Sequence, residues 1–210
     1  MAADDGRLSG LELVGGRPSL DFSNTVGWHD SEEPSEWLHD AGDLVSWLVR
    51  AGLLDGAAEA ALRADVAAWP AAAEALLERG RALREAIYRV LSPVAAGEAA
   101  PAAALAELNE WLAPLVARSR LVAEDGGFAW AWSGEAHDLN RALWPVARDA
   151  AELLTSDELD RVRECGGPGC GWLFVDTSRN RSRRWCSMAD CGNRAKARRH
   201  YHRQKAAREG

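Results

Sequence analysis

The chain has 210 residues, 47% of them hydrophobic, and a formal net charge of −7. This length allows one domain with a hydrophobic core and a small additional module. No segment approaches the roughly 18 consecutive apolar residues of a membrane helix, and the N-terminus lacks the apolar run of a signal peptide. We therefore expect a soluble cytoplasmic protein without membrane contacts.

Helical patterns dominate the first 155 residues. Residues 11–14 predict a short strand, and residues 18–27 a strand or extended turn. Asp40 or Asp43 is expected to cap a helix that stops near residues 52–56, because Leu44, Trp47 and Leu48 follow at helical spacing. Further helices are expected at residues 56–69, 70–91 and 101–117, and the Ala-rich residues 94–106 predict a loop or linker.

The hydrophobic period changes after residue 119. Residues 120–123 and 128–132 predict a β-hairpin around Asp125 and Gly126, with Phe128, Trp130 and Trp132 on one face. A helix over residues 135–154, bent at Pro145, is expected to close the domain. These patterns predict an α+β fold, mainly helical with a small hairpin, for residues 1–155.

Eight of the ten tryptophans lie in this N-terminal part. Large rings at helix and strand spacing are typical of a core, and an aromatic pocket for a small-molecule ligand is the alternative. His29, His39 and His137 with nearby acids would form a second metal or catalytic site only if the fold brought them together. No Gly-x-Ser-x-Gly, His-Glu-x-x-His or phosphate-loop motif is present, so we do not expect an enzyme.

All four cysteines fall within 27 residues, as two C-x4-C pairs separated by fifteen residues: Cys165, Cys170, Cys186 and Cys191. Two short-spaced pairs joined by one loop are typical of tetrahedral zinc sites. Two disulfides are the alternative, but disulfides belong to oxidising compartments and nothing here indicates export. Four thiolates leave no coordination position for a reactive water, so we expect one structural Zn²⁺.

The residues around the cysteines predict the local architecture. Residues 166–169 are rich in glycine and can wrap around a metal. Residues 171–176 predict a strand, 178–181 a turn, 183–186 a returning strand, and 192–208 a helix. A knuckle, a hairpin and a helix together make a treble-clef-like zinc finger, assigned to residues 156–210.

Charge divides the chain unevenly. Residues 161–210 contain 13 Lys and Arg against 4 Asp and Glu, a formal charge of +9, so the first 160 residues carry −16. A polyanion would be attracted by the basic tail alone. Arginine can hold phosphate or guanine with two hydrogen bonds, and a helix fits the major groove of DNA. We therefore expect nucleic-acid binding by Arg179, Arg181, Arg183, Arg184, Arg194, Lys196, Arg198, Arg199, Arg203 and Lys205.

Two alternatives to DNA binding remain at this point. The basic helix could dock on the acidic N-terminal part or on another protein, which would make the finger a zinc-stabilised interaction module. RNA could also be the polyanion, because phosphate contacts carry no sequence information.

The segment from Cys186 to Arg194, together with the Arg183-Arg184-Trp185-Cys186 run, resembles the CGNR zinc finger family, whose ligands correspond to the four cysteines. Residues 20–26, with Trp47-Leu48 and Gly52-Leu53-Leu54, resemble the ABATE domain, which commonly precedes CGNR fingers. This resemblance implies a stress-induced transcription regulator. Together with the basic helix, it leads us to expect a zinc-dependent DNA-binding transcription regulator whose N-terminal domain serves ligand sensing or assembly, for instance as a homodimer.

Overall fold

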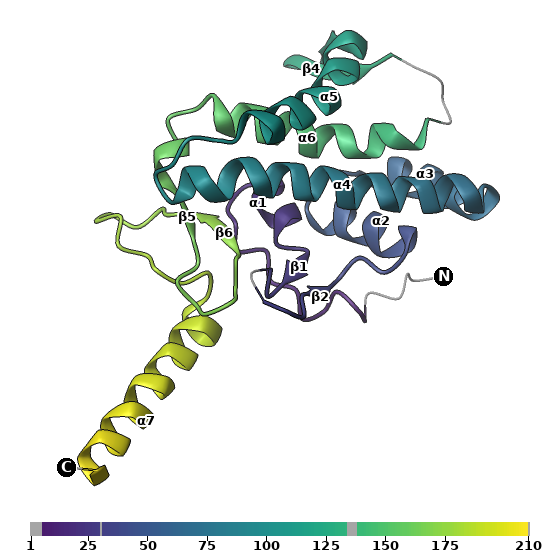
Figure 1. The fold of residues 1–210 in the computed structure, drawn as a ribbon. Coiled ribbons are helices and arrows are strands. Elements are labelled where there is room, and N and C mark those ends of the chain that lie inside the picture. Colours follow the sequence, from purple (N-terminus) through teal and green to yellow (C-terminus); the bar gives the residue numbers. More distant parts are fainter. Residues whose placement is uncertain (1–5, 30, 134–137, 210) are drawn as a thin grey trace.

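A computed structural model describes residues 6–29, 31–133 and 138–209, with side chains as far as residue 205. The long helix α4 (Pro70–Ala95) runs through the centre of the N-terminal part (Figure 1). Helices α5 (Ala102–Arg118) and α6 (Trp144–Leu154) lie along one side of α4, and α1 (Pro18–Ser23) and α2 (Ala41–Arg50) along the other. Helix α3 (Gly56–Ala68) packs against α2 and α4.

Local sequence signals fix the beginnings of these helices, as predicted. The Asp40 side chain accepts a hydrogen bond from the backbone of Asp43, and the Asp43 side chain accepts one from the backbone of Asp40, which makes a capping box at α2. Asp55 caps α3 through the backbone N–H of Ala58. Pro70 begins α4, where its missing N–H costs nothing.

The core lies where α1, α2, α4 and α6 meet. Gly80 allows α4 to approach closely, because a Cβ there would lie 3.2 Å from Leu44 and 3.7 Å from Phe22. Of the eight N-terminal tryptophans, Trp47 and Trp144 are buried, whereas Trp69 is 60% exposed. Trp37, Trp111 and Trp132 are partly buried against the same core, so five of the eight rings belong to it or pack on it, as expected. Among the described residues, no helix is both long enough and apolar enough to cross a membrane.

Three antiparallel strand pairs accompany the helices. Strand β1 (Val26–Gly27) pairs with β2 (Ser35–Glu36), β3 (Ser119–Glu124) with β4 (Gly127–Trp132), and β5 (Val162–Glu164) with β6 (Leu173–Val175). The predicted hairpin around Asp125 is confirmed, and Gly126 adopts the positive φ of 91° that its turn requires.

Several N-terminal predictions are corrected. Residues 18–23 form helix α1 instead of a strand, because Pro18 begins a helical turn and Asp21 adds an acidic group near its N-terminus. Residues 11–14 form no strand. Helix α4 continues past Pro93, so part of the predicted loop at residues 94–106 is helical, as are the residues that begin α5.

The predicted helix over residues 135–154 is divided. Residues 135–137, including His137, lie outside the described residues. A 3-10 helix, η1 (Leu139–Leu143), precedes α6, and Pro145 lies in the first turn of α6 instead of bending one long helix. A proline in the first turn needs no N–H partner, which explains why α6 begins there.

The finger contains a hairpin, but its strands differ from the prediction. Strand β6 pairs with β5, which precedes the first cysteine, and residues 183–186 form no strand. The segment at 183–186 instead runs beside the first cysteine pair, where the carbonyl of Arg184 accepts a hydrogen bond from the N–H of Gly166. A short 3-10 turn, η2 (Leu159–Arg161), leads into β5.

The hairpin β5–β6 belongs to the core of the N-terminal part. Val162, Leu173 and Val175 are buried in the same apolar cluster as α1 and α4. The Asn24 side-chain amide donates to the carbonyl of Leu173 at 2.9 Å and accepts from its N–H at 2.8 Å. The finger therefore obtains hydrophobic support that its own few apolar residues could not supply.

Candidate metal centre and nucleic-acid interface

The four cysteines come together from two chain segments, residues 165–170 and 186–191. Cys165 follows β5, Cys170 precedes β6, Cys186 ends the extended segment at 183–186, and Cys191 lies in the π-helical turn η3 (Met188–Gly192). All four side chains are buried, and their sulfur atoms lie within 4.8 Å of one another. As predicted, the last cysteine stands just before the C-terminal helix α7 (Asn193–Glu209).

The sulfur positions fit a tetrahedral zinc ion. A Zn–S distance of about 2.3 Å implies a separation of about 3.8 Å between sulfurs at the corners of a tetrahedron. The Sγ atoms of Cys170 and Cys186 are 3.8 Å apart, and those of Cys186 and Cys191 are 3.6 Å apart. All four cysteines are free thiols, so the disulfide alternative does not describe this structure.

Electrostatics also call for a cation at this centre. Hydrogen bonds from the thiols of Cys170 and Cys186 lower the pKa of Cys165 to about 2, and the contact with Cys165 raises the pKa of Cys170 to about 12. The thiols therefore cannot all lose their protons together unless a positive charge offsets them. One structural zinc ion supplies that charge and, when bound, fills its coordination sphere with sulfur.

The surrounding backbone is shaped for thiolates. The N–H of Cys186 donates to the sulfur of Cys165 at 3.3 Å, and Nη2 of Arg194 donates to the sulfur of Cys191 at 3.0 Å. A Cβ on Gly167 would lie 3.0 Å from the sulfur of Cys191, so glycine is required for the close approach there. Gly169 and Gly171 take positive φ values of 69° and 67° on either side of Cys170. Gly169 belongs to the predicted glycine-rich turn, whereas Gly171 was expected to begin a strand, which starts only at Leu173.

Asp176 organises the loop at residues 177–184. It is buried, and its carboxylate accepts hydrogen bonds from the backbone N–H groups of Ser178 and Arg183. This arrangement turns Arg179 and Arg181 outward, and both are exposed, as is Arg184. Sequence reasoning missed Asp176, although the spacing Asp-x-Ser is a signal for such a turn.

Arg183 differs from the other predicted nucleic-acid contacts in that its guanidinium is engaged within the protein. Its guanidinium carbon lies 4.1 Å from the ring centroid of Phe174. The same group donates to four backbone carbonyls, those of Val14, Val175, Trp185 and Cys186. Because these hydrogen bonds reach both Val14 and the segment at 183–186, the guanidinium links that segment to the N-terminal part.

Helix α7 extends away from the rest of the molecule (Figure 1). Residues 196–205 are exposed on every face, so the described part of α7 is not docked on the acidic N-terminal part. Within the described residues, none of Lys196, Arg198, Arg199 and Arg203 forms an ion pair. The predicted basic surface therefore divides into α7 and the loop at residues 177–184.

Arg194 lies at the base of α7 and connects it to the N-terminal part. Besides Cys191, its Nη2 contacts the carboxylate of Asp190 at 3.1 Å, and its guanidinium carbon lies 4.2 Å from the ring centroid of Trp28. The next residue, His29, donates its backbone N–H to the carbonyl of Cys170 at 3.3 Å. Residues 28–29 thus contact both the metal centre and the first turn of α7.

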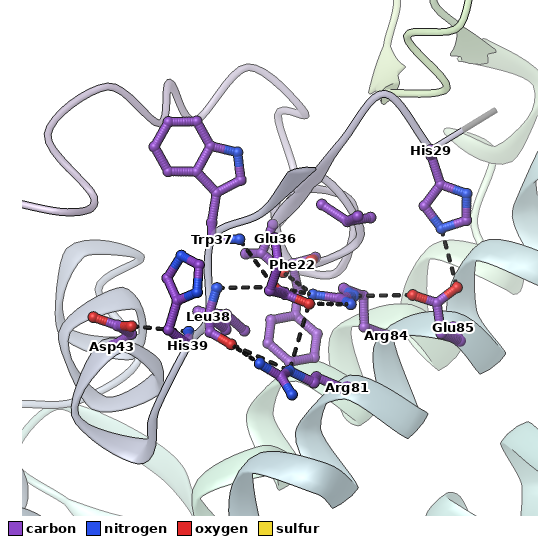
Figure 2. A network of polar contacts seen from close by, with 12 residues as sticks. Phe22, His29, Glu36, Trp37, Leu38, His39, Asp43, Arg81, Arg84 and Glu85 are labelled. Carbon is purple, nitrogen blue, oxygen red and sulfur yellow. Dashed lines mark hydrogen bonds and ion pairs between the residues drawn. The ribbon is translucent and has the colours of Figure 1, made fainter. Parts of the chain in front are cut away.

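A buried polar network lies behind these residues (Figure 2). Arg84, 4% exposed, forms two hydrogen bonds with Glu36, at 2.7 and 2.8 Å, and one with Glu85 at 3.0 Å. Burial alone would raise the pKa of Glu36, but the bonds and the charge of Arg84 hold it below its ordinary value. Nε2 of His29 contacts Glu85 at 3.0 Å.

The histidine alternative is not supported among the described residues. His29 is paired with Glu85, and His39 is exposed on the other side of Glu36 (Figure 2). The cysteine cluster is the one group of potential ligands that the described residues bring together. His137 lies outside that description.

A helical N-terminal part joined to a buried four-cysteine site defines a zinc-finger protein. Two family profiles match the chain. The ABATE profile, described as "putative stress-induced transcription regulator", covers residues 16–157, and the CGNR zinc finger profile covers residues 161–204. Since the first match spans more than half of the chain, the protein belongs to the ABATE family, and it carries a CGNR zinc finger. These families are of regulator and zinc-finger types, and no curated protein matches the chain.

Proposed function

We propose that this protein is a zinc-dependent DNA-binding transcription regulator. In this proposal Cys165, Cys170, Cys186 and Cys191 hold the zinc ion. The ion fixes the finger from which α7 and the loop at residues 177–184 approach DNA. The N-terminal domain, residues 1–155, serves ligand sensing or assembly. One observation carries the proposal: four basic side chains of α7 stand exposed, without ion-pair partners among the described residues, namely Lys196, Arg198, Arg199 and Arg203.

The charge balance supports a polyanionic partner. Four thiolates and one Zn²⁺ together carry −2, so the formal +9 of residues 161–210 becomes about +7. Unpaired surface cations that neutralise phosphates release the counterions of DNA, and this release supplies much of the binding free energy. The acidic remainder of the chain would be repelled from DNA, which orients the molecule with the finger toward it.

The shape of α7 supports insertion into a groove. Its 17 residues give a length of about 25 Å at 1.5 Å per residue, and the major groove of DNA is wide enough for a helix. Arg198 and Lys205 share one face with Arg194, whereas Lys196, Arg199 and Arg203 lie on another face. We assign the loop arginines Arg179, Arg181 and Arg184 to the phosphate backbone beside the groove.

The test is the salt dependence of binding, measured by fluorescence anisotropy with zinc-loaded full-length protein and labelled duplex DNA. Arg198→Ala/Arg199→Ala should weaken binding and reduce the slope of log affinity against log salt by up to about 1.8, or about 0.9 for each lost phosphate contact. Arg118→Ala/Arg120→Ala removes two exposed charges, one at the end of α5 and paired with Asp138, the other within β3, and serves as the matched control, with the slope unchanged.

The outcomes separate the alternatives. If the protein binds duplex or single-stranded RNA more tightly than DNA, the partner is RNA instead of DNA. If neither nucleic acid binds at low salt, the nucleic-acid proposal is wrong, and the finger is better described as a protein-interaction module.

A further inference from the structure

A small cavity of about 150 Å³ lies between the N-terminal part and the finger. Three indole side chains, Trp28, Trp37 and Trp172, contribute to its wall, together with Asp190 and Arg194. The thiol residues Cys170 and Cys186 also line it, so the cavity adjoins the metal centre. Of the residues expected to bind nucleic acid, Arg194 alone lines this cavity.

The aromatic lining is suited to an organic cation. Indole rings attract positive charge through the negative potential of their faces, and groups of aromatic rings are used in proteins to hold quaternary ammonium ions. The protein already contains one such contact here, between the guanidinium of Arg194 and the ring of Trp28. Of the three rings, Trp28 is 38% exposed, whereas Trp37 and Trp172 also pack against the core, which holds them in place.

The charges around the cavity also favour a positively charged ligand. The zinc centre with four thiolates carries −2, and the carboxylate of Asp190 adds a further negative charge. Arg194 is the one basic residue among those that line the cavity, and its charge is offset by its contacts with Asp190 and Cys191. An anion entering the cavity would therefore be repelled, and a cation would be attracted.

The backbone at Trp28 is held in an uncommon conformation. Its φ of 55° is in the left-handed region, which bulky side chains rarely adopt. The hydrogen bonds of the N–H of His29 to Cys170 and of the N–H of Ser31 to the carbonyl of Trp28 hold it there. Such strain is typically retained where it positions a functional side chain, in this case an indole of the cavity wall.

We propose that this cavity binds a compact organic ammonium ion. Its volume suits a ligand with few non-hydrogen atoms, and the occupant would lie against the ring of Trp28, which Arg194 at the first turn of α7 also contacts. Occupancy therefore changes how firmly α7 is held against the N-terminal part. This regulatory consequence rests on the proposed function, whereas the binding itself does not.

Choline and its neutral isostere 3,3-dimethyl-1-butanol provide the test. Each is titrated into zinc-loaded full-length protein without DNA, and the indole N–H resonances are followed by NMR. We expect choline to bind about two- to thirtyfold more tightly than the isostere, the range that cation–π contacts span. The shifted resonances should belong to Trp28, Trp37 and Trp172.

Variants separate the cavity from general aromatic binding. Trp37→Leu should weaken choline binding severalfold, and Trp69→Leu, at a 60% exposed ring that does not line the cavity, should leave it unchanged. If Trp37→Leu fails to fold, the comparison of choline with the isostere on the unmodified protein still tests whether the cavity prefers a cation. Equal affinity for choline and the isostere, or no binding of choline at millimolar concentration, overturns the proposal.

The two proposals can fail separately. If the protein binds choline but no nucleic acid, the cation site is supported and the proposed DNA-binding function is wrong. If it binds nucleic acid without preferring choline to the isostere, the DNA-binding function is supported and the cation site is wrong.

Discussion

Asn24→Ala tests whether the finger depends on the N-terminal part for its stability. The substitution leaves the N–H and the carbonyl of Leu173 buried without their side-chain partners. Each unsatisfied buried group costs about 1–3 kcal/mol, so for two groups we expect the free energy of unfolding to fall by roughly 2–6 kcal/mol. Strand β6 should loosen first, because Asn24 is bonded to its first residue.

Urea denaturation followed by circular dichroism measures this loss, and the rate of zinc transfer to a chelator measures the loosening of the finger. Asn180→Ala, in the exposed loop, is the matched control and should change stability by less than about 0.5 kcal/mol. If Asn24→Ala unfolds at the urea concentration of the unmodified protein and releases zinc no faster, Asn24 does not anchor the hairpin.

Three further perturbations test the core and the metal centre. Burial raises the pKa of Asp21 to about 6 from 3.8, so this group favours the folded state at low pH, and the benefit, about 3 kcal/mol, is lost as pH rises through 6. Asp21→Asn should therefore gain stability over the unmodified protein between pH 4 and 7 in urea titrations. Gly167→Leu should weaken zinc affinity at least tenfold in chelator competition, since its Cβ meets the sulfur of Cys191. Zinc removal should abolish amide protection at Cys186 and Gly192 in hydrogen exchange, while α4 stays protected by its core contacts.

The outcomes that would contradict these expectations are specific. A constant stability difference between Asp21→Asn and the unmodified protein across this pH range would show that Asp21 titrates normally. Unchanged zinc affinity in Gly167→Leu would mean that the first knuckle can move aside. Loss of α4 protection on chelation would mean that the metal stabilises the whole chain.

The metal cluster was predictable because its signal is local. Two C-x4-C pairs need only short loops to place their sulfurs together, and the glycines beside Cys170 indicate the sharp turns. Helix beginnings at Asp40 and Pro70 were predictable for the same reason, since a cap or a first-turn proline acts within one turn.

Features that depend on distant contacts were not predictable. The sequence pattern predicted residues 183–186 as the partner of β6, whereas β5 takes that place because Val162 is buried against α4. Arg183 looks like its exposed neighbours in the sequence, and only the ring of Phe174 and four carbonyls from separate segments distinguish it. Helix α1 was missed because a six-residue helix has too few turns to establish a hydrophobic period.

The position of β5 and β6 also bears on how the protein is made. Synthesis proceeds from the N-terminus, so a growing chain contains α1 and α4 before Val162, Leu173 and Val175 have been added. Until then the apolar surface that these residues cover is open to solvent and to other chains. The last quarter of the polypeptide thus completes the hydrophobic core. Because the four cysteines lie in the same quarter, zinc can bind only after the residues that cover this surface have been synthesised.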